Sequence, residues 1–294
     1  ASNSKAIMCS TPNGDFLLPG HANSVIALDI YGDLVISGSK DKTARLWSLS
    51  ERRQLSCLEG HEQTVTAVAF VPNTDCVVTC SDDTTLKLWR PDGEVCRSAL
   101  STTIAHSSAI NCVVCSQNGS LVATASKDKT AKVWSVEGDQ IRFVRQFTGH
   151  RGYLMAVAFS PVEKLLATSG RDMSVKVWSL DDGTCLYTYT QFTSPITRLS
   201  FISNGSQIIA SERVGSLKVI RLKTGAVDLQ LDEVHDGTIN GLCVSDDGEV
   251  VVTGGEDAKV LVWRDNTSEL EAQEQTANNE LTVAKQEMFN IYNQ

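Results

Sequence analysis

The 294-residue chain has 41% apolar and 21% charged residues, an ordinary composition that excludes an intrinsically disordered protein. Its formal charge of −9 argues against nucleic-acid binding by the whole surface, but it allows a local basic patch. No run of 18 apolar residues is present, so we expect neither a membrane-spanning helix nor a membrane partner. Nine thinly spread cysteines, an odd number, predict a reducing, intracellular protein. Because the first residue is Ala and no leader precedes the pattern, we expect an excerpt of a longer chain.

Residues 1–20 predict two short strands, one through Ala6–Cys9 and one at 16–18, with a turn at 12–14 between them. A repeat begins at residue 21, where a histidine and later a tryptophan recur about every 40–45 residues. Six residues before each tryptophan stands an aspartate, and four residues before that stands a hydroxyl side chain. The five sets are His21, Ser37, Asp41, Trp47; His61, Thr79, Asp83, Trp89; His106, Thr124, Asp128, Trp134; His150, Thr168, Asp172, Trp178; and His235, Thr253, Asp257, Trp263.

A fifth, degenerate copy fills the long gap between Trp178 and Trp263. Its four network positions are Phe192, Ala210, Val214 and Ile220. The polar members are lost together, as expected if a half-satisfied buried network is worse than an apolar one. Alternating segments such as 65–70 and 154–159, followed by turn signals such as Asn118-Gly119, predict four short strands in each copy.

A histidine, a hydroxyl and an aspartate at fixed spacing also occur in hydrolases. Here the set occurs once per copy, so we interpret it as structural, with the aspartate holding the histidine and the hydroxyl bonded to the tryptophan indole. All five histidines are then occupied, which predicts a protein that is not an enzyme and needs no cofactor or small-molecule substrate. Cys112 and Cys115 resemble a metal or redox pair, but three residues apart on a strand they face opposite sides. We therefore assign them, with Cys76 and Cys80, to core packing and predict no metal site.

Residues 265–294 predict an acidic helix, because Ser268 and Glu271 form a capping-box pattern and apolar residues then follow at helical spacing. The apolar stripe consists of Ala277, Leu281, Ala284, Met288 and Ile291. Such a stripe either leads into a helical domain further along the chain, which we favour, or binds a partner, with Leu281, Ala284, Met288 and Ile291 as the contact residues. Its acidic polar face disfavours a membrane surface.

The Gly-His pairs that open the copies and the Leu88-Trp89 and Val177-Trp178 pairs that close them resemble WD40 repeats over residues 15–264. The resemblance implies an all-β propeller at 1–264, with six repeats at 21–263 and a partial seventh blade at 1–20 whose remainder lies upstream. A closed six-blade ring is the alternative. The WD40 resemblance also implies that the turns before the tryptophan strands share one rim of the propeller. We interpret this rim as a surface for RNA or a partner. The basic residues of this predicted rim are Lys40, Lys42, Lys127, Lys129, Arg171 and Arg213.

Longer stretches are similar to the second propeller of one family, transducin beta-like protein three, known in yeast as U-three-associated protein thirteen. They are 17–21, 25–29, 39–47, 149–152, 158–161 and 165–168, and the run 260–265 that leads into an acidic helix. The resemblance implies a nucleolar scaffold of the small-subunit processome, acting in ribosome biogenesis and rRNA processing of the 18S precursor. It implies other propeller subunits as partners, with pre-rRNA or U-three small nucleolar RNA nearby.

The alternative function is that of an adaptor or substrate receptor in another complex, either a ubiquitin ligase or a signalling assembly. Propellers that act as ligase receptors often carry aspartate after the closing tryptophan. The residues found there are Ser48, Arg90, Ser135, Ser179 and Arg264. We therefore place this reading second.

Overall fold

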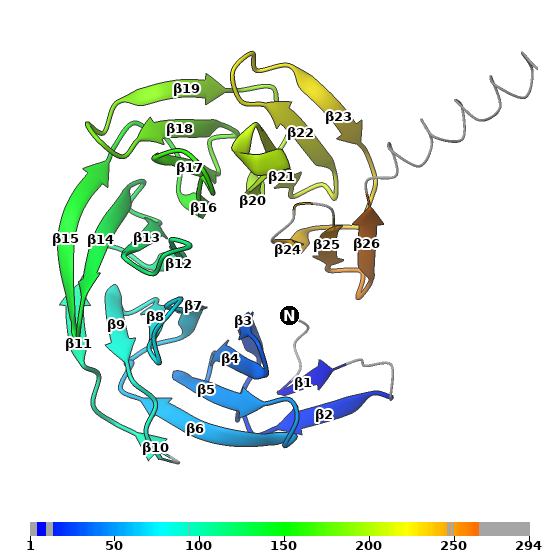
Figure 1. Cartoon of the computed structure of the whole chain (residues 1–294). Coiled ribbons are helices and arrows are strands. Elements are labelled where there is room, and N and C mark those ends of the chain that lie inside the picture. Colours follow the sequence, from blue (N-terminus) through cyan, green and yellow to red (C-terminus); the bar gives the residue numbers. More distant parts are fainter. Residues whose placement is uncertain (1–4, 10–13, 94, 246–247, 249, 265–294) are drawn as a thin grey trace, which may run out of the picture.

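A computed structural model describes residues 5–9, 14–93, 95–245, 248 and 250–264, which form a ring of antiparallel sheets around a central channel (Figure 1). The protein is a six-bladed, all-β propeller. Its described residues contain no α-helix, and their one helical element is a 3-10 turn, η1 (Ser203–Gly205). Within those residues, no helix is long and apolar enough to cross a bilayer. The helix that the sequence predicts at 265–294 lies outside the described residues.

Each blade is built from consecutive strands, the first of which lines the channel (Figure 1). The first blade contains β3 (Val25–Tyr31), β4 (Leu34–Ser39), β5 (Thr43–Ser48) and β6 (Arg53–Glu59), with β10 (Val95–Cys96) added parallel to β6. The second contains β7 (Val65–Phe70), β8 (Val77–Ser81), β9 (Thr85–Trp89) and β11 (Ser101–Ile104). The third contains β12 (Ile110–Cys115), β13 (Leu121–Ser126), β14 (Ala131–Glu137) and β15 (Gln140–Phe147).

The remaining blades follow the same order. The fourth contains β16 (Leu154–Phe159), β17 (Leu165–Gly170), β18 (Val175–Ser179) and β19 (Cys185–Tyr189). The fifth, which is the degenerate copy, contains β20 (Ile196–Ile202), β21 (Gln207–Glu212), β22 (Leu217–Arg221) and β23 (Val227–Leu231). The described part of the sixth contains β24 (Ile239–Val244), β25 (Val250–Gly255) and β26 (Val260–Arg264).

The core lies between blades, because each sheet has two apolar faces and buries them against its neighbours. Trp89 of the second blade, for example, packs with Ile36, Ala44 and Leu46 of the first. Inner strands lie side by side around the channel, β3 against β7, β7 against β12, and onward to β24. β24 and β3, both fully described, do not pack on each other in this way, so the ring of six blades stays open at one position.

The open position holds a two-stranded sheet formed by β1 (Ala6–Cys9) and β2 (Phe16–Pro19), close to the strands that the sequence predicts for residues 1–20. The hairpin stands between the sixth and first blades (Figure 1). Ile7 and Leu18 are buried against Val25 and Trp47 of the first blade. This hairpin therefore covers the outer half of the first blade's free face.

Candidate functional site

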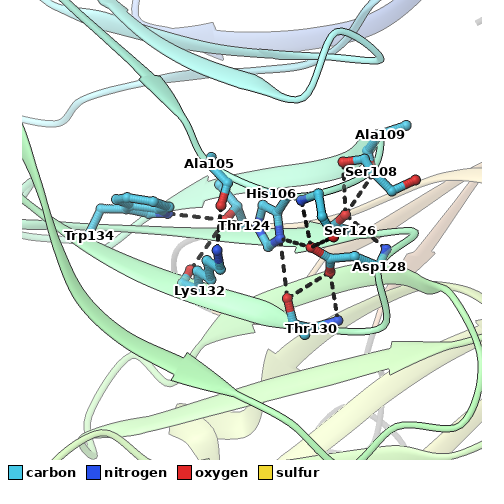
Figure 2. Close-up of polar contacts among 11 residues, drawn as sticks. Ala105, His106, Ser108, Ala109, Thr124, Ser126, Asp128, Thr130, Lys132 and Trp134 are labelled. Atoms are coloured by element: carbon cyan, nitrogen blue, oxygen red, sulfur yellow. Dashed lines mark hydrogen bonds and ion pairs between the residues drawn. The ribbon is translucent and has the colours of Figure 1, made fainter.

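The predicted polar residues of each complete copy meet in one hydrogen-bonded chain, shown for the third blade in Figure 2. His106 lies between two partners, with Nδ1 2.8 Å from Asp128 Oδ2 and Nε2 2.8 Å from Thr124 Oγ1. The indole N–H of Trp134 donates to the same threonine oxygen at 3.1 Å. Asp128 also accepts from the backbone N–H and the hydroxyl of Thr130.

The same chain of contacts recurs in four other blades. Each histidine contacts its aspartate through Nδ1 and its hydroxyl partner through Nε2, and each tryptophan donates to that hydroxyl. The backbone N–H after each histidine donates to the aspartate as well. The network thus ties the loop ahead of the inner strand to the turn between the second and third strands.

The network also sets the charge of its aspartates. Burial would raise the pKa of Asp128, but hydrogen bonds from His106 and Thr130 hold it well below its ordinary value. Asp41, Asp83 and Asp172 are shifted in the same direction, by hydrogen bonds from their own histidines against a similar burial penalty. The pKa of Asp257 is lowered to about 2, again against burial and mainly by His235. These carboxylates are therefore ionised at neutral pH.

The networks engage the histidines, and the structure separates the closely spaced cysteines Cys112 and Cys115. Both ring nitrogens of every histidine are engaged within a blade, so none is positioned as a general base toward a bound substrate. Cys112 and Cys115 lie in different apolar clusters, and burial raises the pKa of both thiols. The described residues hold no group of three or more His, Cys, Asp or Glu side chains that could bind a metal.

The fifth blade contains a different network that the sequence does not reveal. Glu212 accepts from the backbone N–H of Thr193, which is the same loop position that the aspartates hold elsewhere, and from the N–H of Ser194. Lys218 Nζ lies 3.2 Å from Glu212, donates to the carbonyl of Gln191 and sits over the ring of Phe192. Both charged side chains are buried, at 0% and 3% exposure.

The sequence offers only a weak signal for this pair. The first four blades carry a half-buried cation at the position of Lys218, and the sixth carries Leu261 there. Glu212 occupies a place that is Ser or Gly in the other blades. The four network positions of this copy carry the apolar residues Phe192, Ala210, Val214 and Ile220. A buried ion pair replaces their function, which is to tie the loop to the turn.

The predicted basic residues lie at equivalent turns on one edge of the ring. The backbone N–H groups of Lys40, Lys127, Arg171 and Arg213 each donate to a carbonyl in the loop ahead of the inner strand. Lys42 and Lys129 occupy the left-handed third position of their turns, with φ of 72° and 70°, and are exposed. We define these six side chains as the basic rim.

Two of the six cations have local partners. Lys127 Nζ lies 3.5 Å from Asp82, the acidic residue at the same turn of the second blade. The guanidinium of Arg171 lies 5.7 Å from the ring centre of Tyr153. No ion pair or ring contact joins Lys40, Lys42, Lys129 or Arg213 to the rest of the described chain.

The repeat model described as "WD domain, G-beta repeat" matches five segments that cover more than half of the chain, at 11–48, 52–90, 97–135, 141–179 and 229–264. The chain belongs to the WD40 repeat family. The matched segments skip the degenerate copy, which agrees with its loss of all four polar positions.

Curated relatives resemble only parts of this WD40 chain. It is 38% identical over 76 residues to eukaryotic translation initiation factor 3 subunit I of Meyerozyma guilliermondii, covering 25% of this chain and 22% of the relative. It is 40% identical over 62 residues to pre-mRNA-processing factor 19 homolog 2 of Arabidopsis thaliana, covering 21% of this chain and 12% of the relative. It is 40% identical over 77 residues to a human denticleless protein homolog, covering 24% of this chain and 10% of the relative. The matches thus span less than a quarter of each relative's length.

Proposed function

We propose that this WD40 scaffold acts in the small-subunit processome, where it supports maturation of the 18S rRNA precursor beside the U-three small nucleolar ribonucleoprotein. The proposal places it in the nucleolus, with other propeller subunits as protein partners. The basic rim carries the proposal, because it gathers exposed cations along one edge of a molecule whose net charge is −9. Phosphate contacts need this arrangement rather than an overall positive charge.

The stretches similar to transducin beta-like protein three support the same assignment. The curated relatives are named for translation initiation, pre-mRNA processing and denticleless, so they favour the scaffold class without favouring one complex. The last blade ends at Arg264, and the predicted helix that would follow it lies outside the described residues.

The complex itself is tested by tagging the full-length protein in its own cells, purifying it and sequencing the bound RNA. We expect enrichment of U-three small nucleolar RNA and 18S precursor, with the tag visible in the nucleolus. Recovery of ubiquitin-ligase or signalling subunits without those RNAs would overturn the assignment in favour of the alternative, an adaptor or substrate receptor.

The rim is tested with the 294-residue chain and a transcript of the 18S precursor. The double variant Lys42→Glu/Lys129→Glu should lose most RNA crosslinking and flatten the salt dependence of binding by about 1–2 units of slope. The matched control is Lys164→Glu/Lys223→Glu, which makes the same charge change at exposed turns on the opposite edge. Equal crosslinking by both variants would remove the rim from the proposal.

A further inference from the structure

Arg198 is a charged residue at an inner-strand position that is small in every other blade. In each blade this position directly follows the register shift between the first and second strands. The equivalent residues are Ala27, Ala67, Cys112, Ala156 and Gly241. Packing of the inner strands around the channel therefore does not require a long side chain here.

Arg198 lines a cavity of about 380 Å³ in the central channel. Inner-strand residues of the first, second, third and sixth blades also line it, among them Asn111 and Cys112 of the third blade and Asn240 of the sixth. Burial raises the pKa of the Cys112 thiol, and the positive charge of Arg198 opposes that effect. The guanidinium on β20 of the fifth blade therefore acts across the channel, toward β12 of the third.

The charge of Arg198 has no counter-ion in the channel. Its side chain is half-buried, and its one hydrogen bond within the described residues runs from Nη1 to the carbonyl of Thr197, at 2.8 Å. Asp29 is the only other Asp, Glu, Lys or Arg on the six inner strands. Its carboxylate accepts from the backbone N–H groups of Ile30 and Phe70 instead. Because a guanidinium stays protonated, its partial burial without a carboxylate favours an anion from outside the chain.

Two side-chain amides on the cavity wall add neutral donors. Asn111 uses one N–H on the carbonyl of Leu154, at 2.6 Å, and an amide group carries two. Asn240 donates no side-chain hydrogen bond within the part of the chain that the structure describes. These donors and Arg198 come from three different blades, so they approach a bound anion from several directions. A tetrahedral oxyanion offers acceptors in all those directions, whereas a planar carboxylate does not.

We propose that the central channel binds a phosphate group, with Arg198 as its main ligand and the amides of Asn111 and Asn240 as further donors. The guanidinium fork matches two phosphate oxygens, which a single ammonium group cannot do. The cavity volume lies in the range of small-molecule sites, so the group belongs either to free phosphate or to a small phosphate monoester. The molecule is a bound ligand rather than a substrate. This site differs from the basic rim, and the proposal goes beyond the processome assignment without depending on it.

The test is isothermal titration calorimetry of the 294-residue chain with inorganic phosphate, at an ionic strength held constant with sodium chloride. Arg198→Ala should weaken phosphate binding by at least about tenfold. The variant should keep the Tm of the unmodified chain, because three other blades carry alanine at this position. Arg198→Lys keeps the charge but loses the fork, so its affinity should lie between the two. The matched control is Lys223→Ala, which removes one exposed charge from the same blade and should bind phosphate normally.

The choice of anion tests the shape of the site and the source of the phosphate. Sulfate should compete with phosphate, and acetate should not. Tighter binding of glycerol 3-phosphate than of inorganic phosphate would assign the site to a monoester, and the reverse order would assign it to the free ion. The proposal would be overturned if neither phosphate bound, if acetate bound as tightly, or if Arg198→Ala bound phosphate no more weakly than Lys223→Ala.

Discussion

The single residue with most influence on a blade is its turn aspartate. Asp128 is 9% exposed and satisfies donors from Ser107, His106 and Thr130, so Asp128→Ala leaves buried polar groups without partners. We expect a loss of about 1–3 kcal/mol in the free energy of unfolding. The matched control is Val214→Ala, which changes the equivalent position of the fifth blade, where the side chain is 56% exposed, and should shift stability by less than about 0.5 kcal/mol. Urea denaturation that ranks Asp128→Ala as the milder change would contradict the structural role of the network.

The fifth blade shows how an element can keep its architecture with different chemistry. Removing one partner of the buried Glu212–Lys218 pair, by Glu212→Gln or Lys218→Met, leaves the other charge uncompensated. Each single variant should therefore lose about 3–5 kcal/mol of unfolding free energy, and the double variant should lose less than the sum of the two. A double-mutant cycle by urea denaturation measures this coupling. Strictly additive losses would mean that the pair does not act as a unit.

The same blade marks the boundary of what sequence reasoning can predict. The repeat predicts the strands, the five polar networks and the basic turns, because each depends on residue types that recur at the same position of every complete copy. Glu212 does not stand at a position that carries a network residue in the other blades. It lies two residues before Val214, which occupies the place of the network aspartate, and it reaches the loop from there. The exposure of Val260 and Leu28 is likewise not evident from their residue types, because both have the same apolar character as their buried counterparts in the other blades.

At the scale of the whole molecule, the repeated networks couple stability to pH. The five network aspartates have folded pKa values below the ordinary 3.8, as far as about 2 for Asp257 and lower for the others. Their contribution is therefore complete above about pH 4 and is lost as the pH falls, because the unfolded chain binds protons that the folded one does not. Burial raises the pKa of Asp29, so this group changes the stability with pH in the opposite direction, but it is one group against five.

Urea midpoints measured from neutral pH down to about pH 2 should therefore fall steeply below pH 4 for the unmodified chain. Asp128→Asn removes one of the five groups, so its stability deficit relative to the unmodified chain should be constant above pH 4 and should narrow below it. Lys164→Glu, which alters an exposed surface pair, serves as the control and should follow the unmodified chain closely through the acid range. A deficit for Asp128→Asn that stays constant down to pH 2 would show that the carboxylate is not ionised by its network, and the acid sensitivity of the propeller would then need another origin.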